Sequence, residues 1–199
     1  MNQMLKLVVA LVRKKGVLRP RDLAEVDISR EYLRLACEMG LVERVARGLY
    51  SVPGVNLPNP TLAEVCKRVP NGVICLLSAL SFHGLTTQIP HTIQIAIGHK
   101  ARAPKIDFVG VQYFRFSGDA LTEGVETHDL GGVEVKVYSP AKTIADCFKL
   151  RNKIGLSIAI EALRDGLQQR KARIDDLVSF GRICRVERIM RPYTEALVG

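Results

Sequence analysis

The sequence lacks any apolar run that approaches the ~20 residues needed to span a membrane. Its longest N-terminal apolar stretch, residues 7–12, is shorter than the ~7–15 residues of a signal peptide, and three basic residues follow it directly. We therefore expect a soluble, cytoplasmic protein with no membrane partner.

Paired cysteines and metal-ligand motifs are also missing. The five cysteines form no CxxC pair, their number is odd, and most lie in apolar stretches. This pattern favours small buried side chains in a reducing compartment over disulfides or zinc. The four histidines show neither HxxxH nor HExxH spacing, so we expect no metal site.

The common signatures of nucleotide and acyl chemistry are absent as well. There is no Walker loop and no GxGxxG, and no GxSxG turn surrounds Ser78, Ser81 and His83. We interpret the two serines as buried and bonded to their own helix backbone, and His83 as a partner of the helix C-terminus. The sequence therefore predicts no active site and no cofactor.

Acidic residues are few compared with basic ones. The chain has 20 Asp and Glu against 29 Lys and Arg, a net charge of +9, in a composition that is 47% hydrophobic. A packed core is expected, and the basic excess favours a polyanionic partner, with nucleic acid before a membrane surface.

The first fifty residues predict three short helices and a hairpin. Apolar periodicity indicates a helix over 3–15 that ends at Gly16, and Pro20 is well placed in the first turn of a second helix. Ser29 can cap a third helix, which ends at Gly40, and Gly48 suits the tight turn between two short strands. This order is typical of a winged helix-turn-helix.

The remainder predicts a mixed α/β domain that ends in several helices, so the expected fold class is α+β. A connector with three prolines follows the hairpin, and we place the domain boundary there, between residues 1–54 and 55–199. Thr61 and Glu64 suggest a capping box. Gly131-Gly132 suggests a hairpin turn, and Ser139-Pro140 opens a helix. Later helices are expected over roughly 155–169, 174–182 and 185–197.

Arginines are placed where DNA-reading proteins need them. On the third helix, Tyr32, Leu35, Ala36 and Met39 form the face expected to pack inward, and arginines occupy another face. Arginine is the commonest specific donor to guanine, and wing residues contact the backbone beside the groove. The expected DNA contacts in this domain are Arg19, Arg21, Ser29, Arg30, Arg34, Arg44 and Arg47. A solvated face with i,i+4 ion pairs is the alternative.

A second basic stripe is expected on the C-terminal helix. Arg185, Arg188 and Arg191 follow one another at i,i+3 spacing and would form one face of a helix. We expect this stripe to support DNA binding. A solvent-exposed face and a contact with an acidic protein partner are the alternatives.

Several segments together resemble the AbiEi-type antitoxins, the transcriptional-regulator half of abortive-infection toxin–antitoxin pairs. They are RVARGLYSVPG, LLSALSFHGLTTQIP, TIQIAIG, VEVKVYSPAKTIADCFKLRNKIG and AIEALRDGL. The resemblance implies a winged helix that binds inverted repeats in its own promoter, and a C-terminal domain that counteracts a nucleotidyltransferase-type toxin, directly or functionally. The family motif would fall on Thr143, Asp146, Lys149 and Arg151, on one short helix. Asp146 and Lys149 could also simply pair.

Two other functions stay open on the sequence. Glu134 and Lys136 form an ExK pattern on a predicted strand, with Asp107 and Asp129 upstream, as in metal-dependent nucleases. This pattern is common by chance on exposed strands. The other possibility is a stand-alone regulator that senses a ligand with its second domain.

Overall fold

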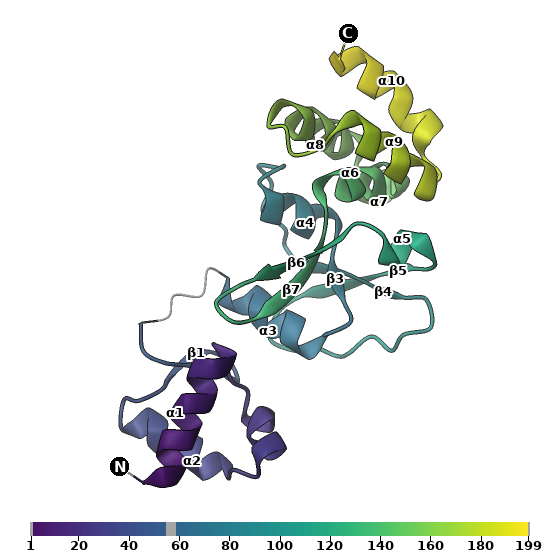
Figure 1. Ribbon diagram of the computed structural model, residues 1–199. Helices are drawn as coiled ribbons and strands as arrows, with labels where there is room; N and C mark the ends of the chain where they lie inside the picture. The colour runs from purple at the N-terminus through teal and green to yellow at the C-terminus, as the bar shows by residue number, and fades with distance from the viewer. Residues whose placement is uncertain (1, 55–58, 199) are drawn as a thin grey trace. The chain divides into compact units, whose positions relative to one another are not determined.

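The computed structural model describes residues 2–54 and 59–198 (Figure 1). The chain divides into two compact units. The N-terminal unit extends to Pro70 and includes His128–Val135, and the C-terminal unit comprises Asn71–Thr127 and the chain from Lys136 onward. The boundary between the units therefore lies after the Pro-rich connector, at residue 70. The sequence had suggested a boundary before the connector, at residue 54. Part of that connector, residues 55–58, lies outside the described residues.

Three helices and a hairpin open the N-terminal unit, in the order predicted from the sequence, and a further helix follows the connector. The second helix is a 3-10 helix rather than an α-helix. The elements are α1 Gln3–Lys15, η1 Pro20–Val26, α2 Arg30–Glu38, β1 Glu43–Ala46, β2 Leu49–Ser51 and α3 Pro60–Arg68.

Local chemistry explains where α2 begins and which side it buries. Asp27 adopts a left-handed conformation with φ 53°, and the Ser29 hydroxyl accepts a hydrogen bond from the Glu31 N–H, as the capping prediction required. Leu33 and Ala36 are buried on α2, whereas Met39 is 56% exposed. The predicted inward face was therefore rotated, because Leu33 and not Met39 packs into the core of this unit.

A residue before η1 also pairs with the second strand of the hairpin. Leu18 and Tyr50 exchange two backbone hydrogen bonds of 2.8 and 2.9 Å, which form one antiparallel bridge. Gly48 lies at the turn with φ 72°. Nearby, Gly16 and Gly132 approach so closely that a Cβ on Gly16 would lie 2.6 Å from the Gly132 Cα, which only glycine permits.

The main sheet has five strands in the order β5-β4-β3-β7-β6. Its central strand β3 pairs antiparallel with β4 and parallel with β7, and β4 pairs parallel with β5. Reciprocal hydrogen bonds between Leu130 and Val133 close the β6–β7 turn over Gly131-Gly132, which confirms that hairpin. The strands are β3 Val73–Ile74, β4 Ile93–Gly98, β5 Val111–Phe116, β6 Val125–Asp129 and β7 Glu134–Tyr138.

Helices of the C-terminal unit gather on one side of its sheet (Figure 1). Helix α6 lies at their centre, and eight consecutive residues from Ala141 to Phe148 are buried. The Ser139 hydroxyl caps α6 as predicted, with Pro140 in the first turn. The helices are α4 Leu76–His83, α5 Asp119–Thr122, α6 Pro140–Lys149, α7 Arg151–Ile154, α8 Leu156–Gln168, α9 Ile174–Ile183 and α10 Glu187–Val198.

Two predicted helix starts are wrong. Helix α3 is capped by the Asn59 side chain, which accepts from the Leu62 N–H, and not by a box of Thr61 and Glu64. Helix α10 begins at Glu187, so Arg185 precedes it in a left-handed conformation with φ 59°. Among the described residues, no helix is long and apolar enough to cross a membrane.

Candidate nucleic-acid interface and the α6 motif

A basic cleft of about 340 Å³ opens on the N-terminal unit. It lies between the start of η1, the N-terminus of α2, the hairpin turn and the end of α3. One acidic residue, Glu64, also lines it. Its cations are Arg19, Arg21, Arg30, Arg47, Lys67 and Arg68. The structure thus brings four of the predicted arginines into one cleft and adds two cations from α3.

Arg19 is held by neighbouring groups rather than presented to solvent. Its guanidinium donates to both carboxylate oxygens of Asp22 and to the Lys67 carbonyl, at 2.7 Å for the latter. Burial by itself raises the pKa of Asp22, but the hydrogen bonds from the Arg19 side chain and N–H outweigh it and lower the pKa below its usual value. Arg19 therefore has a structural role here, because it joins η1 to α3.

Lys67 and Arg68 were not among the predicted DNA contacts. The Lys67 ammonium donates to the Val17 carbonyl at 2.5 Å, and the Lys67 carbonyl accepts from Arg19 and from Arg21. Burial lowers the pKa of Lys67 to about 8, although the Asp22 carboxylate opposes this shift. The expected boundary at residue 54 had assigned α3 to the other domain, and the two basic residues in its last turn were the only signal available.

The arginines of α2 differ in their partners. Arg34 pairs with Glu38 and, at 3.5 Å, with Glu31, so the ion-pair alternative holds for this residue. Arg30 is exposed, lines the basic cleft, and pairs with no carboxylate in the described part of the chain. Ser29, which caps α2, is exposed beside it. Of these two arginines, Arg30 lines the cleft and Arg34 does not.

The two arginines of the wing, Arg44 and Arg47, also differ in position. Arg47 is exposed and lines the basic cleft, next to Gly48. Arg44 is exposed but outside the cleft lining, and its Nε donates to the Ala46 carbonyl at 3.3 Å. Both lie on the hairpin, so the wing presents cations at its turn and along its first strand.

The four residues expected to carry the family motif divide into a buried pair, Thr143 and Asp146, and a more accessible pair, Lys149 and Arg151. Thr143 donates from its hydroxyl to the Tyr138 carbonyl at 3.0 Å, and Asp146 pairs with Lys142 at 2.5 Å, with both charged side chains fully buried. The pairing of Asp146 with Lys149 suggested by their spacing is wrong, because Lys149 points to the exposed side of α6. Arg151 belongs to the separate helix α7 and donates to the Phe148 carbonyl at 3.0 Å.

Lys142 and Asp146 form a polar cluster inside the C-terminal unit. The Lys142 ammonium lies 4.0 Å from the centre of the Tyr138 ring and 5.0 Å from that of Phe116, which suits cation–π contacts. The Cys184 thiol donates to Asp146 at 3.3 Å. Burial raises the pKa of Asp146, and Lys142 opposes that shift. No sequence pattern indicated a buried Lys142, because lysines are rarely buried.

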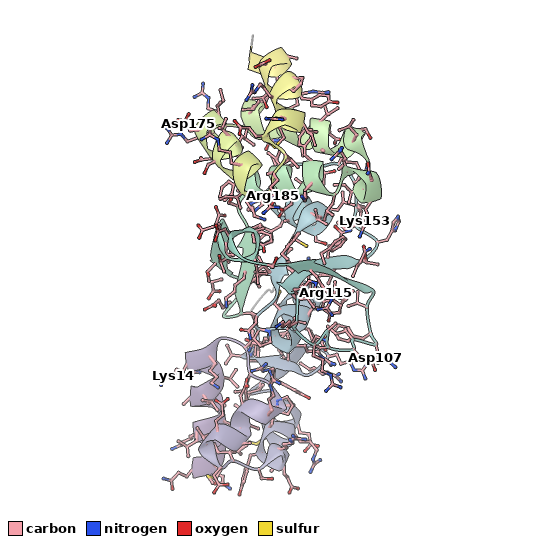
Figure 2. The ribbon with its side chains drawn as sticks, turned by 90° about the vertical axis from the view of Figure 1, so that its right-hand side faces the viewer. Lys14, Asp107, Arg115, Lys153, Asp175 and Arg185 are labelled. Carbon is pink, nitrogen blue, oxygen red and sulfur yellow. The ribbon has the colours of Figure 1, made fainter. Side chains whose placement is uncertain are left out.

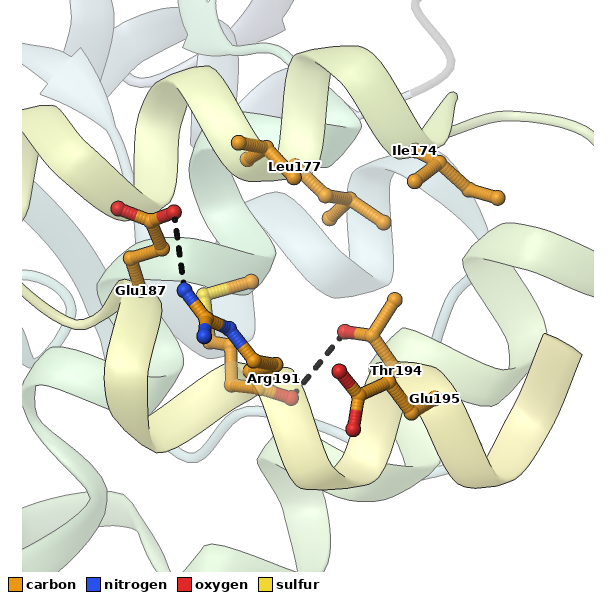
Figure 3. A pocket seen from close by; sticks show the side chains of 8 residues that line it. Ile174, Leu177, Glu187, Arg191, Thr194 and Glu195 are labelled. Carbon is orange, nitrogen blue, oxygen red and sulfur yellow. Dashed lines mark hydrogen bonds and ion pairs between the residues drawn. The ribbon is translucent and has the colours of Figure 1, made fainter. Parts of the chain in front are cut away.

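The predicted stripe on the C-terminal helix is shorter than expected. Arg188 and Arg191 are exposed on α10, but Arg185 lies outside the helix and cannot continue their row. Figure 3 shows Arg191 turned toward Glu187, 3.5 Å away, at the edge of an apolar groove of about 240 Å³ between α9 and α10.

Other sequence candidates have structural roles. His83 contacts the Tyr138 carbonyl at 2.8 Å, while Lys171 donates to the His83 carbonyl at the end of α4, so Lys171 has the role we expected of His83. Ser78 accepts from the Gln94 N–H of β4 rather than bonding within its own helix, and Ser81 is exposed.

The possible nuclease residues gain no support from the geometry. Asp129 accepts from the Gly132 N–H at 2.6 Å and so stabilises the hairpin turn. Glu134 is exposed at the start of β7. Within the described residues, no group of three or more His, Cys, Asp or Glu side chains could hold a metal ion.

Comparisons with known proteins found one family match and a similar solved structure. The crystal structure of the RV2827C protein from Mycobacterium tuberculosis is similar in fold, with a TM-score of 0.53 and 15% identity, over 92% of this chain and 72% of that one. No curated protein matches the chain. Residues 6–53 match the family described as "Transcriptional regulator, AbiEi antitoxin". That segment covers most of α1, all of η1 and α2, and the hairpin, and over it the chain is similar to the AbiEi antitoxin regulators.

Proposed function

We propose that this protein is a DNA-binding antitoxin that represses its own toxin–antitoxin operon. The basic cleft is the observation that carries the proposal, since it gathers six cations beside the N-terminus of α2. That arrangement suits a winged helix-turn-helix in which α2 enters the major groove and the β1–β2 wing grips phosphates beside it. The family match over residues 6–53 supports a regulator of this kind.

The C-terminal unit would counteract the toxin. The resemblance along the α6 segment supports a nucleotidyltransferase-type toxin, encoded beside this gene, as the target. Lys149 and Arg151 would be the motif residues available to a partner, because Thr143 and Asp146 are buried. A role in phage defence follows from the same assignment.

Duplex DNA that carries the inverted repeat of the promoter tests the first half of the proposal. A gel-shift titration at several salt concentrations should show tighter binding to this repeat than to a scrambled duplex, with an affinity that falls as salt rises. Equal affinity for the two duplexes at every salt concentration would contradict the repressor assignment.

Helix α10 offers a second surface for the same DNA. Arg188 and Arg191 are exposed there, and each phosphate neutralised adds about 0.9 to the slope of log affinity against log salt. Changing both to Gln should lower that slope by up to about two. An unchanged slope and affinity would confine DNA binding to the N-terminal unit.

A further inference from the structure

A second, larger cleft lies in the C-terminal unit. Its volume is about 560 Å³, within the roughly 300–1,000 Å³ typical of small-molecule sites. It lies between three parts of the fold: the end of β5 with the loop that follows it, the C-terminal end of α6, and the end of α9. Three separate elements therefore converge on one space.

The charged side chains at this cleft favour an anion. Arg115, Lys149 and Arg185 line it, and all three are exposed. Figure 2 labels Arg115 and Arg185 on the C-terminal unit. Of its two acidic residues, Asp146 is neutralised by the buried Lys142, which leaves only Asp119 against three cations. The accessible charge is thus positive.

One of these cations is held in place before any ligand arrives. The Arg115 guanidinium donates from Nη1 to the carbonyls of Gly98, His99 and Ala101, at 3.3, 2.8 and 2.8 Å. A positively charged group fixed by the backbone loses little freedom when an anion binds, and this favours affinity. Arginine also suits phosphate oxygens, because its donors form a planar fork.

The walls of the cleft include apolar surface beside the cations. Phe116 and Ile183 line it and are half-buried. The Phe116 ring is fixed by an edge-on contact with Tyr138, with 6.0 Å between ring centres. Such a wall can contact a base or another flat group while the cations hold a phosphate.

From this combination we propose that the cleft binds a small phosphate-bearing molecule of nucleotide size. Lys149 and Arg185 would contact the phosphate together with Arg115, and Phe116 would contact the remainder. This site is independent of the proposed DNA-binding cleft, and either proposal can fail without the other. It shares Lys149 with the surface proposed to face the toxin.

Calorimetric titration of the full chain tests the inference, with ADP, GDP, CDP and UDP as probes and inorganic phosphate as the minimal anion. At least one nucleotide should bind in the micromolar range. Inorganic phosphate should bind with an affinity at least about tenfold lower, because it cannot reach the apolar wall. The double variant Lys149→Gln/Arg185→Gln should lose about tenfold or more in affinity, as two charge-assisted contacts are removed.

The matched control is Lys153→Gln/Arg164→Gln, which removes the same two kinds of charge from exposed positions outside the cleft. It should bind the nucleotide as the unaltered chain does, and circular dichroism should show both variants folded. The inference is overturned if no probe binds at millimolar concentration, or if both double variants lose affinity equally. It is also overturned if Lys149→Gln/Arg185→Gln weakens only DNA binding, because the cleft would then be a contact for DNA phosphates.

Discussion

Several charged side chains in this protein are buried or partly buried and join one helix to another. Lys142 and Asp146 are both fully buried, yet each has a partner, and the Cys184 thiol adds a third member to the cluster. Arg19 joins η1 to α3 through Asp22 and a carbonyl. Charged residues that would normally lie at the surface therefore contribute to the interior of both units.

Breaking the buried pair on α6 should strongly destabilise the protein. Asp146→Asn keeps the shape but leaves the Lys142 ammonium buried without a carboxylate, so we expect the free energy of unfolding to fall by about 3–5 kcal/mol. Lys142→Met combined with Asp146→Leu should be close to neutral, because it removes both charges. Urea unfolding measures both, and an Asn variant as stable as the unaltered chain would show that the pair is not an ionic one.

The Asp22–Arg19 pair should make stability depend on acid pH. The folded pKa of Asp22 is lower than its usual value of 3.8, so its contribution is fully present above about pH 5 and is lost as pH falls through the folded pKa. Asp22→Asn should reduce the free energy of unfolding by about 1–3 kcal/mol at pH 7. The difference from the unaltered chain should shrink toward pH 2.

A series of unfolding curves from pH 7 to pH 2 measures this effect. The control is Glu31→Gln on the exposed side of α2, where a change below about 0.5 kcal/mol is expected. A difference for Asp22→Asn that stays constant down to pH 2 would contradict a lowered pKa.

Among helices and strands, sequence patterns predicted most of the longer elements, but they missed β3 and α5 and predicted poorly what each element packs against. The caps at Ser29 and Ser139 and the glycine turns were predicted correctly, because they depend on groups only a few residues apart. The inward face of α2 and the cap of α3 were not. Apolar periodicity predicts which side of a helix is buried only to within about one residue. Packing against neighbouring elements then determines that Leu33 is buried and Met39 is exposed.

The two arginines of α2 should affect DNA binding differently. Arg30→Ala should cost ~1–3 kcal/mol on the promoter repeat and reduce the preference over a scrambled duplex, since Arg30 is free to meet a base edge. Arg34→Ala should weaken binding to both duplexes alike, because Arg34 mainly balances Glu31 and Glu38. Gel-shift titrations on both duplexes measure this preference.

Lys6→Ala serves as the control, because Lys6 is exposed on α1 and outside the basic cleft. It should leave the preference unchanged. If Arg30→Ala keeps the full preference for the repeat, α2 is not the helix that reads the bases.

At the scale of the whole molecule, repression and toxin neutralisation should be separable. The chain forms two compact units, but α3 belongs with the first, so cutting at residue 54 would remove the groups that α3 packs against. Substitution in the full chain is the cleaner test. Arg30→Ala/Arg47→Ala should abolish repression of a promoter reporter and still rescue cells from the partner toxin.

Both readouts should be made at equal protein level, with Lys149→Gln/Arg151→Gln as the reciprocal variant. That variant should repress normally and rescue poorly. Loss of rescue by a folded Arg30→Ala/Arg47→Ala protein would show that neutralisation requires bound DNA.

The amino-acid sequence was enough to predict the mixed α+β class, the N-terminal arrangement of helices before a hairpin, and the basic character that suggests DNA. These depend on local spacing, capping and net charge, which neighbouring residues carry. The packing of distant segments determines that α3 completes the N-terminal unit and that Lys67 and Arg68 join the basic cleft. It also determines that Asp146 pairs with Lys142 and that Arg185 leaves α10. The reason is physical: which residues become buried, and which charges meet, depends on segments far apart in the chain, and local patterns carry no information about them.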